Sequence, residues 1–265
     1  MPLKYAFISP HPPIIIPEIG QDQIQYCQKT VNAMLNVSLE ASEKNPDLII
    51  IISPHGIIYP HAISLRIPSD GTLIGSFADF GLFEPVFQFI NDNDFGLTLI
   101  NNCINANLKI QGIADNSLDH GALVPLYYLE RALNKKTSIL TINISLESNK
   151  KHYEFGKILS ETIEKDPRNI VFIASGDLSH RLTPNAPAGY SSLGKKFDNL
   201  LIEMLEQNET ERILNLDPFF CDEAGECGLR SICTFLGIIE NMPFKKNKIS
   251  YEGPFGVGYL VMSAS

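Results

Sequence analysis

The sequence contains no tryptophan, and its five cysteines include no C-x-x-C pair. The missing pair argues against a structural zinc site, and the odd number of cysteines argues against a disulfide framework. Both observations favour a reducing compartment, so we expect a cytoplasmic protein. Because tryptophan is absent, any aromatic lining of a pocket must come from phenylalanine, tyrosine or histidine.

Long apolar runs and basic patches are also absent. No run approaches the ~20 apolar residues that a membrane helix needs, and no signal-peptide pattern marks the N-terminus. The formal net charge is −9, and the lysine doublets stand apart from one another. Since nucleic-acid-binding domains normally show clustered basic residues, we expect neither a nucleic acid nor a membrane as a partner.

Several catalytic signatures are missing as well. The chain has no G-x-S-x-G nucleophile turn, no glycine-rich phosphate loop and no dinucleotide fingerprint. Residues 251–258 are rich in glycine, but Pro254 disfavours a helix-opening phosphate loop. We interpret this stretch as a close-approach turn that lines a pocket.

One pattern occurs three times in the chain: an apolar run, a turn and then a histidine. Residues 48–52 are a leucine and four isoleucines, Ser53-Pro54 stops the run, and a histidine follows directly. The same order occurs in residues 5–11 and, with a Gly-Asp-Leu-Ser turn, in residues 170–180. Short β-branched runs bounded by turn residues predict buried strands of a parallel or mixed sheet.

The pattern places His11, His55 and His180 just beyond the carboxyl ends of three predicted strands. Ligands of open α/β sheets bind outside these strand ends, so parallel strands would bring the three histidines to one edge. A single such histidine is often only a turn residue bonded to a nearby carbonyl. Three in the same context favour a shared site.

The length of 265 residues and a hydrophobic content of 44% suffice for a full core, and we expect one domain over residues 1–265. The alternation of strands and helices predicts an α/β fold with a central mixed, mostly parallel sheet between helices. Residues 62–67 and 73–77 are predicted to form a hairpin, and residues 84–91 a helix. Asp119 is a plausible cap for a helix that runs to about residue 133. We interpret His61 and His152, which lack a comparable context, as surface residues.

Histidines at strand ends suit metal binding or general acid–base chemistry. Two histidines and one carboxylate would form the facial triad that leaves open positions on Fe(II). The candidate carboxylates are Asp119, Asp177, Glu223, Glu226 and Glu252, and their spacing does not choose among them. Each has a structural alternative: Asp177 could be a turn residue, Asp119 a helix cap and Glu226 a residue of a helix first turn.

Five motifs together resemble the class III extradiol ring-cleavage dioxygenases, the family of the catalytic LigB subunit. They are Pro10-His11-Pro12-Pro13, Ser53-Pro54-His55-Gly56, Leu118-Asp119-His120-Gly121, Gly176-Asp177-Leu178-Ser179-His180 and Gly225-Glu226-Cys227-Gly228. The residue sequences of these motifs are most similar to those of the Memo-like branch of the AmmeMemoRadiSam system, in which the stretch at 251–258 also recurs. The resemblance covers essentially the whole chain and implies a three-layer α/β/α sandwich of the LigB type.

The resemblance also implies the site. His11 and His55 would be the imidazole ligands of a non-haem Fe(II), and Glu226 would be its carboxylate ligand. His180 would be the general base that deprotonates a catechol-type aromatic substrate, with O2 as the second substrate. The remaining implied roles are His120 as a donor to substrate or dioxygen, Asp119 as the residue that orients it, and Asp177 as the residue that positions the His180 turn.

The presence of Cys227 next to Glu226 leaves the identity of the metal undecided. Memo-like proteins are thought to use a cysteine near the third ligand position, and a softer ligand set would favour copper or zinc over Fe(II). The alternative, which we favour, is that Cys227 is a buried thiol. The resemblance further implies a homodimer and partner proteins of the AmmeMemoRadiSam system.

Two other functions compete with ring cleavage. A zinc-dependent hydrolase on the same scaffold would use an activated water, and a metal-binding module without catalysis would act with a radical-SAM system. The sequence does not identify the substrate. Arg181 and Arg230 are the arginines nearest to the motifs, and neither demands a carboxylated catechol.

Overall fold

An eight-stranded sheet runs through the middle of the protein in the computed structural model, which describes residues 1–265. In spatial order the strands are β6 (Ile110–Ile113), β3 (Ile63–Arg66), β7 (Ser138–Asn143), β2 (Leu48–Ser53), β8 (Ile170–Ser175), β1 (Leu3–Ser9), β10 (Tyr259–Ala264) and β9 (Lys246–Glu252). The central strands β7, β2, β8 and β1 are parallel, whereas β3 and β10 run antiparallel to them. The predicted mixed, mostly parallel sheet is confirmed.

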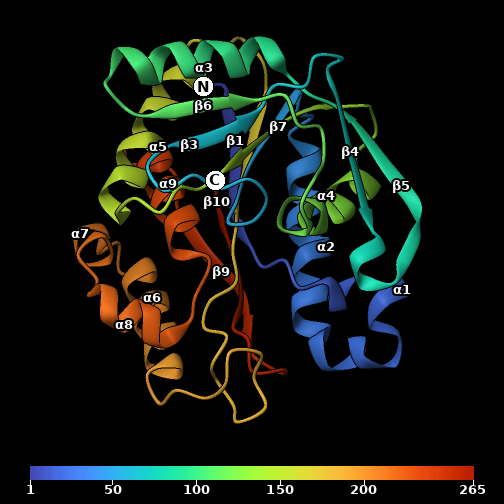
Figure 1. The fold of residues 1–265 in the computed structure, drawn as a ribbon, viewed down its shortest axis with the longest axis vertical. Coiled ribbons are helices and arrows are strands. Elements are labelled where there is room, and N and C mark those ends of the chain that lie inside the picture. Colours follow the sequence, from blue (N-terminus) through green and yellow to red (C-terminus); the bar gives the residue numbers. More distant parts are fainter.

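Helices cover both faces of this sheet (Figure 1). One face carries α3 (Asn93–Asn105), α5 (Asn149–Glu164), α6 (Gly194–Glu206), α7 (Thr210–Leu214), α8 (Pro218–Ala224) and α9 (Leu229–Ile239). The other carries α1 (Pro17–Gly20), α2 (Gln28–Glu43), α4 (His120–Ala132), the 3-10 segments η1 (Pro13–Ile15), η2 (Gln21–Cys27) and η3 (Ala78–Phe80), and a separate ribbon of β4 (Thr72–Phe77) and β5 (Leu82–Ile90). The three-layer α/β/α arrangement follows.

The isoleucine run is explained by the two-sided burial of β2. Ile50 and Ile52 belong to the hydrophobic core on the α5–α9 side, and Ile49 and Ile51 belong to the core on the α2–α4 side. Successive side chains of a strand point to opposite faces, so a strand covered on both faces needs apolar residues at every position. All six residues of β2 are buried.

Two local predictions are wrong. Residues 84–91, expected as a helix, belong mostly to β5, where aromatic and β-branched residues pair with β4. The expected hairpin between residues 62–67 and 73–77 does not form, because β3 joins the main sheet between β6 and β7. The composition of residues 86–90 favours a strand, and the long-range pairing of β3 is not encoded locally.

None of the helices combines the length and the apolar composition required to cross a bilayer.

His152 was expected at the surface, and the structure shows that this expectation is wrong. His152 belongs to the first turn of α5, and its side chain is fully buried. Nδ1 donates to the Ser148 carbonyl at 3.0 Å, and Nε2 accepts the Ser145 N–H at 3.2 Å. Both bonds require the neutral ring, and burial lowers the His152 pKa from 6.5 to about 4.

This buried histidine predicts a loss of stability in acid. Between about pH 6.5 and pH 4 the unfolded chain takes up a proton at His152 that the folded chain does not, so the free energy of unfolding falls as the pH falls. A difference of two to three pKa units corresponds to roughly 3 kcal/mol. Urea titrations at several pH values should show this slope in the wild type and a shallower one in His152→Gln. Equal slopes in the two proteins would contradict the assignment.

Candidate metal centre

Three strands end level with one another at the edge of the sheet that carries the histidines. Ser9 of β1 lies opposite Ser175 of β8, and Ile52 of β2 lies opposite Ala174, which places Ser53 level with both serines. His11 and His55 each follow their serine by two residues. The predicted convergence of strand ends is therefore present in the structure.

Three imidazoles gather at this edge. The Nε2 atoms of His11 and His55 are 3.0 Å apart, and the ring of His120 lies 4.2 Å from that of His55 and 5.5 Å from that of His11. Their candidate ligand nitrogens all lie within 4.8 Å of one another. Neutral imidazole is a common ligand for Fe, Zn and Cu, so these residues could hold a metal ion.

The hydrogen bonds around His11 fix which of its nitrogens is free. The Ser175 hydroxyl donates its only hydrogen to the Gly121 carbonyl, so it accepts from Nδ1–H of His11 at 2.9 Å. His11 Nε2 is then unprotonated and faces His55. A ligand histidine whose other nitrogen donates to a fixed acceptor is the usual arrangement at metal centres.

The distance between the two Nε2 atoms tests whether a metal fits. Two nitrogens that each lie about 2.1 Å from one ion are about 3.0 Å apart when they subtend a right angle. The observed separation is 3.0 Å. The donor set of His11 and His55 therefore fits a first-row transition metal.

Burial keeps these rings neutral. His11 is only 2% exposed, and desolvation, followed by the fields of His55, His120 and His180, holds its pKa well below the ordinary value. Desolvation also lowers the pKa of His55 to about 4 and lowers that of His120. An imidazole must be uncharged to bind a metal ion, and at a pH near 7 these rings are already uncharged.

Asp119 ties His120 to the end of β2. Its carboxylate caps α4 by accepting the Ala122 N–H at 3.1 Å, and it also accepts the Ser53 hydroxyl at 2.5 Å. The predicted cap is confirmed. A Cβ on Gly121 would lie 2.4 Å from Ser53 Oγ, so glycine permits this close approach.

Sequence reasoning missed a buried arginine behind this cap. Arg66 of β3 is 1% exposed, donates to Asn143 Oδ1 at 2.7 Å and lies 3.9 Å from Asp119 Oδ2. Asn143 in turn donates to the carbonyl of His55. The only signal in the sequence is a charged residue between two apolar ones, Leu65 and Ile67.

His180 lies beside the centre with a free nitrogen. Its Nδ1 is 2.9 Å from the Gly225 carbonyl, which can only accept, so the hydrogen is on Nδ1 and Nε2 carries the lone pair. The side chain is 25% exposed, and burial lowers its pKa. This arrangement can accept a proton from a bound molecule.

Asp177 contacts both a candidate metal ligand, His11, and the predicted base, His180. Its Oδ1 accepts the His11 N–H at 2.9 Å, and its Oδ2 is 3.9 Å from both His11 Nε2 and His180 Nε2. Burial raises the pKa of this carboxyl to about 7. Asp177 thus joins the turn of His180 to the chain at His11.

Glu226 and Cys227 occupy different positions from the three imidazoles. Glu226 Oε2 accepts the Leu229 N–H at 2.6 Å in the first turn of α9, and burial raises its pKa to about 7. Glu226 does not belong to the group of ligand atoms within 4.8 Å of one another. The Cys227 thiol lies 3.7 Å from His11 Nε2, and burial raises its pKa well above the ordinary value.

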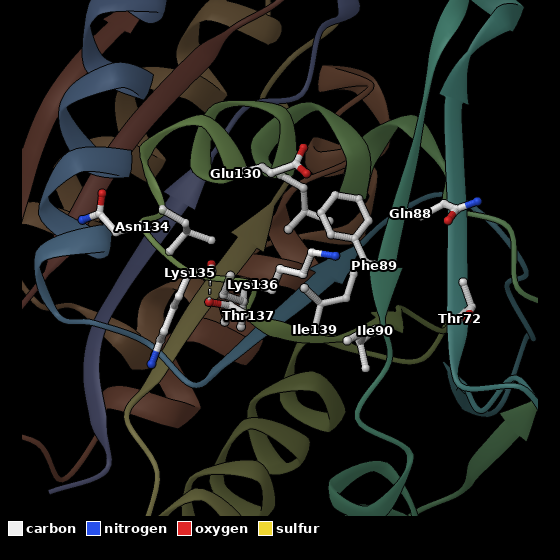
Figure 2. A pocket seen from close by; sticks show the side chains of 13 residues that line it. Thr72, Gln88, Phe89, Ile90, Glu130, Asn134, Lys135, Lys136, Thr137 and Ile139 are labelled. Carbon is white, nitrogen blue, oxygen red and sulfur yellow. Dashed lines mark hydrogen bonds between the residues drawn. The ribbon is translucent and has the colours of Figure 1, made fainter.

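A separate cavity of about 480 Å³ lies at the opposite end of the parallel strands, between α4 and the β4–β5 ribbon. Figure 2 shows Ile139, Phe89 and Lys136 around it. No histidine or cysteine lines this cavity, so it does not share the chemistry of the histidine edge.

Comparison with known proteins agrees with the site. Residues 5–262 match the family described as the catalytic LigB subunit of aromatic ring-opening dioxygenase, and the chain belongs to this family. An uncharacterised protein from Escherichia coli K12, JW3007, has the same fold, with a TM-score of 0.67, 14% identity and 98% of each chain covered.

Three relatives are similar in sequence. Protein CA_C1420 from Clostridium acetobutylicum is 34% identical over 99% of this chain, which spans only 57% of that protein. The 2-aminophenol 1,6-dioxygenase beta subunit from Pseudomonas sp is 24% identical over 83% of this chain and 79% of its own length. The 3,4-dihydroxyphenylacetate 2,3-dioxygenase from Escherichia coli is 18% identical over 80% of each chain. Two of these three relatives are named as dioxygenases or dioxygenase subunits.

The hydrogen bond between Ser175 and His11 predicts a specific defect in metal binding. Ser175→Ala removes the acceptor of His11 Nδ1–H, and we expect zinc affinity, measured by competition with a chromophoric chelator, to fall by about 10–100-fold. Ser9→Ala is the matched control, because the Ser9 hydroxyl donates to the Pro10 carbonyl and contacts no imidazole. Equal affinities in Ser175→Ala and wild type would contradict the role of Ser175.

Proposed function

We propose that the protein is a metal-dependent extradiol dioxygenase that uses Fe(II) and O2 to open a catechol-type aromatic ring. The observation that carries the proposal is the approach of the Nε2 atoms of His11 and His55 to 3.0 Å, beside a third histidine, His180, whose Nε2 carries a free lone pair. Such a reaction needs side chains that bind one metal ion and a separate general base.

The names of two relatives support the substrate class. They specify 2-aminophenol and 3,4-dihydroxyphenylacetate, both of which carry a phenol next to a second hydroxyl or amino group. Two adjacent proton-bearing groups can chelate a metal once a proton is removed. We propose the same class of substrate for this chain.

In the proposed reaction His11 and His55 would hold the metal through Nε2, and the chemistry that Fe(II) would supply when bound is electron transfer between the aromatic ring and dioxygen. The free Nε2 of His180 takes the proton from the substrate hydroxyl, and the Gly225 carbonyl stabilises the resulting imidazolium through Nδ1–H. Asp177 Oδ2, 3.9 Å from His180 Nε2, favours the same protonated ring when it is ionised. His120, whose ring lies 4.2 Å from that of His55, would donate to substrate or dioxygen, and Asp119 caps the start of its helix.

Three residues are candidates for the third protein ligand of the metal. Glu226 is the ligand that the resemblance implies, and it is held on the Leu229 N–H in this structure. His120 lies closer to the other two imidazoles, and the Cys227 thiol lies 3.7 Å from His11 Nε2. Single variants of the three residues separate these assignments.

One observation favours a second candidate function. Three imidazoles within 4.8 Å form a donor set that also suits zinc with one open position, as in zinc-dependent hydration and hydrolysis. A Memo-like metal-binding protein or a metal-dependent hydrolase is therefore the alternative. Copper would fit the same rings together with the Cys227 thiol.

The metal assignment predicts the outcome of anaerobic loading with Fe(II). We expect one iron per wild-type chain by elemental analysis, and loss of that iron in His55→Ala. His61→Ala is the control, since His61 is exposed and pairs with Glu147. Iron retained at one per chain in His55→Ala would refute the site, and preferential zinc or copper uptake would favour the alternative function.

The same assay decides the third ligand. Glu226→Gln keeps an acceptor for the Leu229 N–H, so iron loss in this variant would identify the carboxylate as a ligand rather than a cap. Loss in His120→Ala or Cys227→Ser, with Glu226→Gln unaffected, would assign the ligand to the imidazole or the thiol.

The base assignment predicts a separable defect. His180→Ala should retain the metal but lose about 10²–10⁴-fold in kcat for a catechol substrate, measured by oxygen uptake, because general base catalysis contributes a factor of that size. Wild-type activity in His180→Ala would show that another residue acts as the base.

A further inference from the structure

A buried aspartate outside the histidine edge has no part in the proposed reaction. Asp198 is the fifth residue of α6 and is fully buried on the helix face that also carries Phe197 and Leu201. A carboxyl group on an apolar helix face is costly unless its oxygens are hydrogen-bonded. Burial raises the pKa of Asp198 to about 6.

Both oxygens of Asp198 have defined donors. Oδ1 accepts the backbone N–H of Ser179 at 2.8 Å, and Oδ2 accepts the hydroxyl of Tyr251 at 2.6 Å. Ser179 immediately precedes His180, and Tyr251 begins the glycine-rich stretch at 251–258. The aspartate therefore connects a motif of unexplained role to the predicted base.

The same glycine-rich stretch holds the backbone beside His180. The Leu178 N–H donates to the Gly258 carbonyl and the Gly258 N–H donates to the Ser179 carbonyl, each at 2.8 Å. A Cβ on Gly258 would lie 2.1 Å from Asp198 Oδ2, the oxygen that accepts from Tyr251, so glycine at this position leaves room for the carboxylate. The backbone of residues 178 and 179 is thus held by two hydrogen bonds to Gly258 and one to Asp198.

The same turn is also bonded to the chain at residues 224 and 225. The Ser179 hydroxyl donates to the Ala224 carbonyl at 2.7 Å, and His180 Nδ1 donates to the Gly225 carbonyl at 2.9 Å. The tautomer of His180 depends on this second bond, and the bond depends on where the Ser179–His180 peptide is held. A shift of that peptide would release Nδ1–H and leave the tautomer undefined.

We propose that Asp198 and Tyr251 are positioning residues that hold the Ser179–His180 peptide, so that His180 keeps its hydrogen on Nδ1 and presents Nε2 as the base. The inference rests on the proposed role of His180. It assigns to the 251–258 stretch the task of fixing the base, in place of lining a pocket.

The test measures the His180 tautomer directly, by long-range ¹⁵N–¹H correlation spectra of the metal-free protein. We expect the hydrogen on Nδ1 in the wild type, a mixture of tautomers in Asp198→Ala, and a smaller change in the same direction in Tyr251→Phe. Asp198→Asn should retain the wild-type tautomer, because its carbonyl still accepts the Ser179 N–H and its amide can donate to Tyr251. His152, with the same Nδ1–H to carbonyl bond, is an internal reference that should not change.

Tyr5→Phe is the matched control. Tyr5, like Tyr251, is on a strand and donates its hydroxyl hydrogen to a carboxylate, that of Glu40, at 2.6 Å. This bond does not involve the turn that carries His180. In parallel, oxygen uptake with catechol should show a loss of about 100-fold in kcat for Asp198→Ala at unchanged iron content, the size expected for a misplaced catalytic group. Asp198→Asn should recover most of that loss.

An unchanged His180 tautomer in a folded Asp198→Ala would overturn the proposal. If Asp198→Ala does not fold, Tyr251→Phe decides: a wild-type tautomer there overturns the proposal, and a mixture supports it. If the wild type consumes no oxygen with catechol, the proposed function fails, whereas the spectra still test the positioning of His180.

Discussion

The histidine edge depends on the pairing of β8 with β1 on one side and β2 on the other. Because this pairing is parallel and in register, three strand ends stop at one level, and the serine that ends each strand lies next to its neighbours. Parallel pairing of this kind is found in sheets buried on both faces, and here both faces are covered. The helices therefore do more than shield the strands: α4 begins with His120, and its first turn is bonded to the ends of β2 and β8 through Ser53 and Ser175.

Charge at this edge is governed by desolvation. Burial depresses the pKa of His11 and His55 and raises the pKa of Asp177 and Glu226 to about 7, so each group is pushed toward its neutral form. A divalent cation would reverse the balance for the carboxyl groups, because a nearby positive charge favours their ionised form. The site is thus built from groups whose charge state responds to what is bound there.

Much of this arrangement can be predicted from the sequence. The isoleucine run and the repeated pattern ending in histidine predict the strands, and the convergence of His11 and His55 follows from strand direction alone. The approach of His120 does not follow, since it depends on the packing of α4 against β2. Arg66 and Ser175 act through contacts between distant segments. The helix predicted over residues 84–91 is wrong for a different reason, because the composition of residues 86–90 already favours a strand and β5 pairs with the preceding strand β4. The single domain over residues 1–265, the Memo-like branch, the homodimer, the AmmeMemoRadiSam partners and the cytoplasmic location stay predictions.

The serines show how a local signal can be read too narrowly. From the sequence alone, Ser53 and Ser9 are parts of strand stops, because proline follows each of them. In the structure the Ser53 hydroxyl accepts the His55 N–H and donates to Asp119, and Ser175 orients His11 from the neighbouring strand. Two of the three serines at these strand ends therefore belong to the hydrogen-bond network around the candidate ligands, whereas the Ser9 hydroxyl bonds the Pro10 carbonyl.

The two-sided burial of β2 has a consequence for the chain before it has folded. A six-residue segment with four isoleucines, no charge and no proline has the composition of segments that self-associate as stacked strands. In the native sheet β7 and β8 occupy both of its hydrogen-bonding edges, and the two helical layers cover its faces. Since β8 is formed by residues more than a hundred positions later, nascent chains and fragments that end before Ile170 would expose this segment to aggregation.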